Sequence, residues 1–250
     1  MVTAAAALMA RGFGGSASEV LTVGAAVLTG QLSIGWSNDA IDAERDRQVG
    51  RTDKPAASGA LSVSALRTAS IVAVVLTIIA SLLLGVEAGA VHLLGVVAMG
   101  WAYNLGLKST LASAVPYAVA FGTLPSVASV PVLDRWAPLW LGVTGAAIGV
   151  AAHLANALPD LADDALTGVR GLPHRIGERG GRRAAAVVLA LAVGVVLGEA
   201  GLAPVVLALV VAAAAGCLAL LLFGRSSRAL PSIMALTVLI IVVAGGRISG

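Results

Sequence analysis

The sequence contains few charged residues for its length. They make up 12% of the 250 residues, whereas soluble globular domains carry roughly 25%. Hydrophobic residues make up 58%, and the mean hydropathy is +0.97. A soluble fold of this composition would lack the polar surface that it needs. The sequence therefore predicts a polytopic membrane protein whose apolar surface faces lipid.

Several common kinds of site are excluded by what the sequence lacks. Its one cysteine, Cys217, excludes an intramolecular disulfide framework and a cysteine zinc site. The three histidines are scattered along the chain. There is no Walker phosphate loop, no G-x-G-x-x-G after a strand and no nucleophile–histidine–acid triad. A net charge of +3 is too small to indicate nucleic acid as a partner.

Long apolar runs predict an all-α fold, because a helix needs about 20 mainly apolar residues to cross a bilayer. Eight runs qualify, at 19–38, 63–86, 88–107, 110–131, 137–158, 184–200, 203–223 and 230–247. Residues 1–10 are apolar but too short to span. We expect a single domain over 1–250 that forms a bundle of about eight transmembrane helices, with 1–10 as the stump of another.

Basic residues indicate how the chain is oriented in the membrane. If the loop after the first predicted helix is cytoplasmic, 13 of the 16 Lys and Arg residues lie on that side, and the exceptions are Arg11, Arg135 and Arg247. This asymmetry follows the positive-inside rule. The sequence thus predicts an integral protein of the cell (inner) membrane, with this loop facing the cytoplasm.

Acidic residues gather in two segments on the same side. Nine of the 13 lie within 39–53 and 160–178. The first segment reads N-D-x-x-D-x-x-x-D from Asn38 to Asp46, and a continuing helix places these four residues on one arc of about 100°. Asp160 and Asp164 share a face in the same way. The remaining acids of these segments are interpreted as solvated loop charges: Glu44, Asp53, Asp163 and Glu178.

Carboxylates at helical spacing repel one another, and acids at membrane depth are costly, so the two clusters indicate a functional site. A divalent cation bound between the carboxylates would remove both their repulsion and the cost of their charge at membrane depth. Mg²⁺ binds oxygen ligands and usually combines one or two carboxylates with substrate phosphates. Basic side chains beside the acids suit phosphate oxygens. The pattern predicts Mg²⁺ and a diphosphate between the clusters, with phosphate contacts from Arg51, Lys54, Lys108 and Arg170.

Three motifs resemble those of the UbiA superfamily of intramembrane prenyltransferases. The first is N-D-A-I-D-A-E-R-D at 38–46, followed by R-T-D-K-P-A-A-S-G at 51–59. The second is Y-N-L-G-L-K at 103–108, and the third is N-A-L-P-D-L-A-D-D-A-L-T-G at 156–168, followed by G-L-P-H-R-I-G. Ala157 departs from the pattern, because many members carry an acid there, and members usually have nine helices.

The resemblance implies a set of site residues. Mg²⁺, and through it the diphosphate of an isoprenoid donor, would be bound by Asn38, Asp39, Asp42, Asp46, Asp160 and Asp164. The acids expected to carry catalysis are Asp42, Asp46, Asp160 and Asp164. The diphosphate would be contacted or oriented by Arg51, Lys54, Tyr103 and Lys108, beside the Arg170 that the charge pattern adds.

The implied reaction is Mg²⁺-dependent prenyl transfer. The allylic C–O bond of a prenyl diphosphate ionises once charge on the leaving diphosphate is stabilised. A lipophilic acceptor, such as an aromatic compound or a quinone precursor, then attacks the cation. The pocket would open to membrane lipid, where the apolar tail of the donor stays in a medium like itself. The sequence specifies no oligomeric state.

Three alternatives use similar features. A terpene cyclase of the same superfamily would ionise the same donor and close the cation on itself without an acceptor. CDP-alcohol phosphotransferases also place paired aspartates at a membrane face, but their signature begins with Asp-Gly, whereas Asp39 is followed by Ala40. A cation transporter would place its acids near the bilayer midplane, often on broken helices. The acids here follow the apolar runs and have arginines around them.

Overall fold

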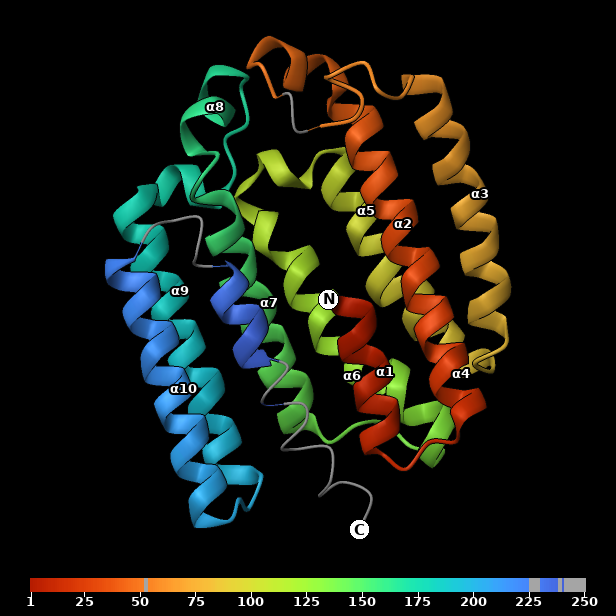
Figure 1. The fold of residues 1–250 in the computed structure, drawn as a ribbon, viewed down its shortest axis with the longest axis vertical. Coiled ribbons are helices and arrows are strands. Elements are labelled where there is room, and N and C mark those ends of the chain that lie inside the picture. Colours follow the sequence, from red (N-terminus) through yellow and green to blue (C-terminus); the bar gives the residue numbers. More distant parts are fainter. Residues whose placement is uncertain (52–53, 225–229, 238–239, 241–250) are drawn as a thin grey trace.

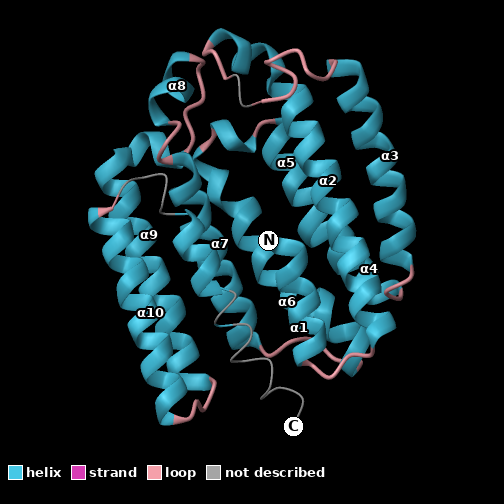
Figure 2. Ribbon diagram, in the orientation of Figure 1, coloured by secondary structure: helices cyan, strands magenta, loops and turns pink. Residues whose placement is uncertain are grey.

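The structure is a computed structural model that describes residues 1–51, 54–224, 230–237 and 240. Over these residues the chain forms helices joined by short connections, without a strand (Figures 1 and 2). Seven helices of the described chain are long and apolar enough to cross a membrane. They pack into one bundle, which confirms the predicted all-α fold.

These seven helices correspond to seven of the eight predicted spans. They are α2 (Ala17–Gln48), α3 (Val63–Leu82), the run α4–η1–α5 (Val86–Ala90, Val91–Val97 and Ala98–Leu105), η3–α6 (Leu111–Ala114 and Val115–Leu133), α7 (Leu139–Ala157), α9 (Leu172–Glu199) and α10 (Pro204–Phe223). The eighth, 230–247, lies partly outside the described residues, and its portion 230–237 is helical. Asp53 and Arg247 also lie outside them.

Helix α2 has 32 residues and continues well past its predicted end at residue 38. It begins at a capping box, in which the Ser16 hydroxyl accepts a hydrogen bond from the Glu19 N–H (3.3 Å) and the Glu19 carboxylate accepts one from the Ser16 N–H (2.7 Å). Arg45 and Arg47 lie in its last turn, where cations complement the helix dipole. The segment from Asn38 to Asp46 is therefore helical, as its spacing predicts.

The N-terminal residues form α1 (Val2–Gly12), a helix of 11 residues. At 1.5 Å per residue its length is about 16 Å, roughly half the hydrocarbon thickness of a bilayer. Helix α1 begins near the middle of the bundle in Figure 1 and packs against α2 and α6, with Ala6, Met9 and Ala10 buried. This agrees with the prediction that residues 1–10 are too short to span.

The third span contains a π-helical segment, η1. Such segments add a residue to a helical turn and occur frequently at functional sites. After it, α5 ends at Leu105, and the next residue, Gly106, has a φ of 154°, which is accessible to glycine and strained for other residues. The chain then turns through the short 3-10 helix η2 (Leu107–Ser109), which carries Lys108. The break in α5 thus sets the position of this lysine.

The two acidic segments meet at one end of the bundle. The C-terminal end of α2 and the short helix α8 (Leu161–Leu166) both lie at the top of Figure 1. Helix α9 also starts there, at Leu172 rather than at the predicted residue 184, and it bends at Gly177 (φ 68°, ψ 174°). The outward faces of the long helices expose aliphatic side chains, among them Ile71, Val75, Leu191 and Leu209, as expected for surfaces in contact with lipid.

Candidate active site

A pocket of about 420 Å³ opens at the end of the bundle that carries the acids. Its lining comes from α2, the third span, η2, α6, α7, α8 and the start of α9, which are far apart in the sequence. Most of the predicted site residues line it: Asn38, Asp42, Asp46, Arg51, Lys54, Tyr103, Lys108, Asp160 and Asp164. Helix α2 contributes a stripe with the spacing of one helix face, from Gln31 to Asp46.

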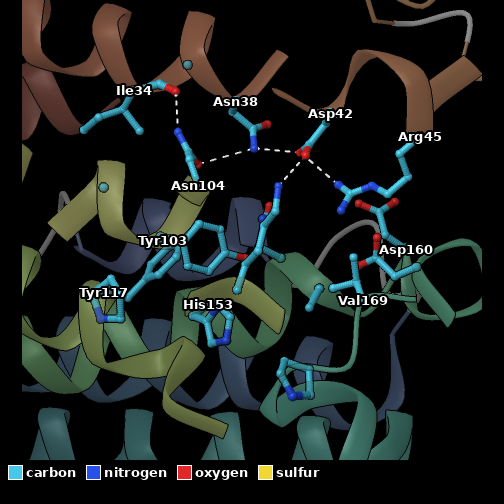
Figure 3. A pocket seen from close by; sticks show the side chains of 18 of the residues that line it. Ile34, Asn38, Asp42, Arg45, Tyr103, Asn104, Tyr117, His153, Asp160 and Val169 are labelled. Atoms are coloured by element: carbon cyan, nitrogen blue, oxygen red, sulfur yellow. Dashed lines mark hydrogen bonds and ion pairs between the residues drawn. The ribbon is translucent and has the colours of Figure 1, made fainter. Parts of the chain in front are cut away.

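Asp42 is the most densely paired acid of the pocket. Its side chain is 8% exposed, and its carboxylate accepts a hydrogen bond from the Asn38 amide (2.9 Å). It forms ion pairs with Arg45 (2.8 Å) and with the ammonium group of Lys108 (Figure 3). A buried carboxylate is costly unless it is paired in this way. Asp46, one turn further along α2, is also buried and lines the pocket.

Asn104 fixes the position of Asn38. Its amide N–H groups donate to the carbonyl oxygen of Ile34 (2.8 Å) and the hydroxyl of Ser37 (2.9 Å), and its oxygen accepts from the Asn38 amide (3.4 Å; Figure 3). This side chain therefore connects α5 to α2 directly beside the acids. Sequence reasoning did not single out Asn104, although it stands beside Tyr103 in the Y-N-L-G-L-K motif at 103–108.

The second acidic segment faces basic groups as well. Asp160, directly before α8, forms an ion pair with Arg51 (3.2 Å), which follows α2. The carboxylate of Asp164 lies 3.3 Å from His174 Nε2, at the start of α9. Asp163, interpreted from sequence as a solvated charge, also lines the pocket. The Arg51–Asp160 pair joins the two acidic segments across 109 positions of sequence.

Burial changes the charge equilibria of two groups at the pocket mouth. It raises the pKa of Asp164, against the opposing effects of Arg45 and His174. It also lowers the pKa of Lys108, although the hydrogen bond to Asp42 acts in the opposite direction. Each shift favours the neutral form of the group. A bound cation beside Asp164, or a bound anion beside Lys108, would stabilise the charged form.

Two predicted site residues lie outside the pocket. Asp39 is not part of the lining, and its carboxylate instead pairs with the ammonium group of Lys54 (2.7 Å). It lies at the edge of the arc that faces the pocket, about 60° around the helix from Asp42. Arg170 is exposed on the loop before α9 and does not line the pocket either. The structure therefore assembles the predicted set without these two.

The inner part of the pocket is aromatic. The ring centroids of Tyr103 and Tyr117 lie 5.3 Å apart in an edge-to-face arrangement, and His153 lies 4.9 Å from Tyr117. Phe121 continues this series one turn further along α6, 6.3 Å from Tyr117 with nearly parallel rings. Tyr103 and Tyr117 are the two tyrosines of the chain. Tyr117 and Phe121 were not predicted, because neither belongs to a motif with a recognisable spacing.

His153 is held by its own contacts on the wall of the pocket. Its Nε2 lies 3.0 Å from the Ser113 hydroxyl, which also accepts a hydrogen bond from the Leu172 N–H (3.0 Å). This link joins α7, η3 and the start of α9. It fixes the start of α9, where His174 faces Asp164.

The side-chain oxygens of the pocket suit Mg²⁺, which usually binds through a few protein ligands together with substrate phosphates. Within the described part of the chain, no three His, Cys, Asp or Glu side chains converge into a complete metal site. Oxygen donors nevertheless line the pocket in two groups, Asn38 with Asp42 and Asp46 on α2, and Asp160 with Asp164 beside α8. Asp42, Asp160 and Asp164 each lie against a basic side chain in this structure, with which a cation would have to exchange.

A comparison with known protein families identifies the family of the chain. A model of the UbiA prenyltransferase family matches residues 1–242. The chain belongs to the UbiA prenyltransferase family. This result confirms the resemblance drawn from the three motifs. The described residues contain seven helices long and apolar enough to cross a membrane. This UbiA family member is therefore an integral membrane protein and an intramembrane prenyltransferase.

Solved structures of UbiA proteins share its fold. An apo structure of a UbiA homolog from Aeropyrum pernix K1 has a TM-score of 0.79 at 17% identity, over 96% of this chain and 94% of that one. A UbiA homolog from Archaeoglobus fulgidus bound to GPP and Mg²⁺ has a TM-score of 0.69 at 17% identity, over 100% and 96%. A digeranylgeranylglyceryl phosphate synthase has a TM-score of 0.67 at 17% identity, over 98% and 92%. No curated protein matches the sequence.

Proposed function

We propose that the protein is a single-domain, Mg²⁺-dependent enzyme that transfers a prenyl group from a prenyl diphosphate to a lipophilic acceptor in the membrane. The observation that carries this proposal is one pocket with two groups of carboxylates at its mouth, basic side chains among them, and an aromatic inner part. Charge for a diphosphate and apolar space for a hydrocarbon are thus adjacent. The acceptor would be an aromatic compound, a quinone precursor or another lipophilic molecule.

The acids and bases at the mouth divide the work of holding the donor. Mg²⁺ would be held by Asn38, Asp42, Asp46, Asp160 and Asp164, and when bound it neutralises charge on the leaving diphosphate. Lys108, Arg51 and Lys54 line the same pocket and are placed to contact phosphate oxygens. Asp39 then acts indirectly, because its pair with Lys54 orients that lysine. We assign no phosphate contact to Arg170, because it is exposed and does not line the pocket.

The inner pocket protects the reactive carbon. When the allylic C–O bond breaks, the bonding electrons leave with the diphosphate and the prenyl carbon becomes cationic. The ring faces of Tyr103 and Tyr117 attract such a cation, and the surrounding apolar side chains keep water away from it. A carbon of the acceptor then supplies the electron pair for the new bond, and the acceptor releases a proton.

Two further observations support the proposal. The homolog from Archaeoglobus fulgidus was solved with GPP and Mg²⁺, and in another structure with DMAPP and Mg²⁺. The charge asymmetry of the sequence supports a pocket mouth that faces the cytoplasm at the inner membrane. On that side the water-soluble diphosphate head of the donor can remain at the mouth while its apolar tail enters the inner part of the pocket.

Release of diphosphate by the purified protein tests the proposal. We would supply geranyl, farnesyl and geranylgeranyl diphosphate, with and without Mg²⁺ and with and without a panel of aromatic acceptors, and extract the lipid products. The expected result is Mg²⁺-dependent release that requires an acceptor and yields a prenylated product. Release without an acceptor, with a cyclic hydrocarbon as product, would instead identify a terpene cyclase. Ion flux in liposomes without diphosphate release would identify a transporter.

A further inference from the structure

The inner end of the pocket is closed by few side chains. Helix α6 starts beside the acids and runs away from them, so its lining residues mark depth in the pocket. Phe121 is the last of these, about 9 Å along the helix axis from the first residue of α6. Ala120, Val96 and Gln31 line the same end from α6 and the neighbouring helices. A hydrocarbon that enters from the acids therefore meets Phe121 at the far end.

A second cavity lies directly beyond Phe121. Its volume is about 50 Å³, and it is lined by apolar side chains and one threonine from α1, α6 and α7, together with Met234, Thr237 and Ile240. On α6 its lining is Phe121, Leu124 and Pro125, the continuation of the stripe that lines the first pocket. Phe121 is the residue that the two linings share. Its side chain therefore lies between the donor pocket and this second, apolar cavity.

The position of Phe121 is fixed by the packing of α6 on α7. A Cβ atom on Gly149 would lie 2.8 Å from the Cβ of Phe121, and one on Gly145 would overlap the Phe121 carbonyl group. The helices approach closely at this point because both positions are glycine. Pro125 lacks the N–H that would bond to the Phe121 carbonyl within the helix, which leaves this carbonyl free to contact α7. Stacking on Tyr117 fixes the ring from the other side.

We propose that Phe121 sets the length of prenyl donor that the enzyme uses. The inference rests on the proposed function, because it assumes that the pocket binds a prenyl diphosphate. With its diphosphate at the carboxylates, a short donor ends before Phe121, whereas the tail of a longer donor must pass it. A smaller side chain at this position connects the two cavities and gives the longer tail apolar space. A larger one shortens the pocket.

Donor preference in substituted proteins tests this inference. We would measure kcat/KM for diphosphate release from geranyl, farnesyl and geranylgeranyl diphosphate, with the full-length protein and saturating Mg²⁺ and acceptor. Phe121→Ala should raise the ratio of long-donor to short-donor kcat/KM by about tenfold or more, the effect that small size differences have in hydrophobic pockets. Phe121→Trp should shift the ratio in the opposite direction. Opposite shifts from two substitutions are not expected from a general loss of packing.

Leu124→Ala is the matched control, since Leu124 is buried on the same helix and lines only the second cavity. With Phe121 in place the donor cannot reach it, so the ratio should stay at its wild-type value. Equal losses for all donors in both Phe121 variants, or a shift in the control as large as in Phe121→Ala, would overturn the inference. Absence of diphosphate release from every donor by the wild-type protein would instead refute the proposed function and, with it, this inference.

Discussion

Asp42 and Lys108 lie 66 residues apart in the sequence and form an ion pair inside the pocket. Asp42 belongs to α2 and Lys108 to η2, and their side chains are 8% and 10% exposed. Arg45 supplies a second cation to the same carboxylate. Under the proposed function, a carboxylate with two cationic partners can exchange one of them for Mg²⁺. The displaced lysine is then free to meet the diphosphate at the same place.

Replacement of Lys108 by methionine tests its role at the diphosphate. We expect Lys108→Met to lower the rate of diphosphate release by about 10²–10³, the usual effect of losing one charged or hydrogen-bonding group at a developing negative charge. Asp42 keeps Arg45 and Asn38, so the loss of stability should stay below the about 3–5 kcal/mol typical of a broken buried pair. Steady-state kinetics and thermal unfolding in detergent measure the two effects. Lys108→Arg, which keeps the charge, should retain more activity; equal losses in both variants would contradict a phosphate contact.

Asp42 and Asp39 should differ sharply when each is changed to asparagine. Asp42 lines the pocket, whereas Asp39 only orients Lys54. Asp42→Asn should therefore abolish Mg²⁺-dependent release, and Asp39→Asn should reduce it by about 10–100-fold, the usual cost of losing an outer partner of a site. Titration of activity with Mg²⁺ in both variants, with membrane insertion checked separately, measures the difference. Equal loss in the two variants would return Asp39 to the metal ligands.

The sequence predicts the acids of the site well, because their geometry is local. Asn38, Asp42 and Asp46 share an arc on any helix, and the structure continues α2 through them. The order of the apolar runs likewise predicts the bundle. Other features depend on tertiary packing that spacing does not encode. Tyr117 reaches the pocket only because glycines let α6 and α7 approach. Asp39 lies at the edge of the arc of α2 that faces the pocket, and its pair with Lys54 keeps it out of the lining.

Asn104 should act through Asn38 rather than on the donor itself. Substitution by alanine removes its hydrogen bonds to Ile34, Ser37 and Asn38, so the Asn38 amide loses one of the contacts that orient it. We expect Asn104→Ala to weaken activation by Mg²⁺ about 10–100-fold. The maximal rate at saturating Mg²⁺ should fall much less. Titration of diphosphate release with Mg²⁺ separates the two parameters, and an unchanged Mg²⁺ requirement would show that Asn38 needs no such support.

The raised pKa of Asp164 predicts how activation by Mg²⁺ depends on pH. Burial favours the protonated form of this carboxyl group, so in the metal-free enzyme it keeps its proton to a higher pH than an ordinary aspartate does. Protons and Mg²⁺ compete for a carboxylate ligand. As the pH falls through the raised pKa, the Mg²⁺ concentration required for half-maximal diphosphate release should therefore rise. As the pH rises above it, the requirement should reach a plateau. Asp164→Asn has no proton to lose, so it should need more Mg²⁺ at every pH and show a flatter dependence. Parallel pH profiles for the wild type and Asp164→Asn would assign the titration to another carboxylate of the pocket.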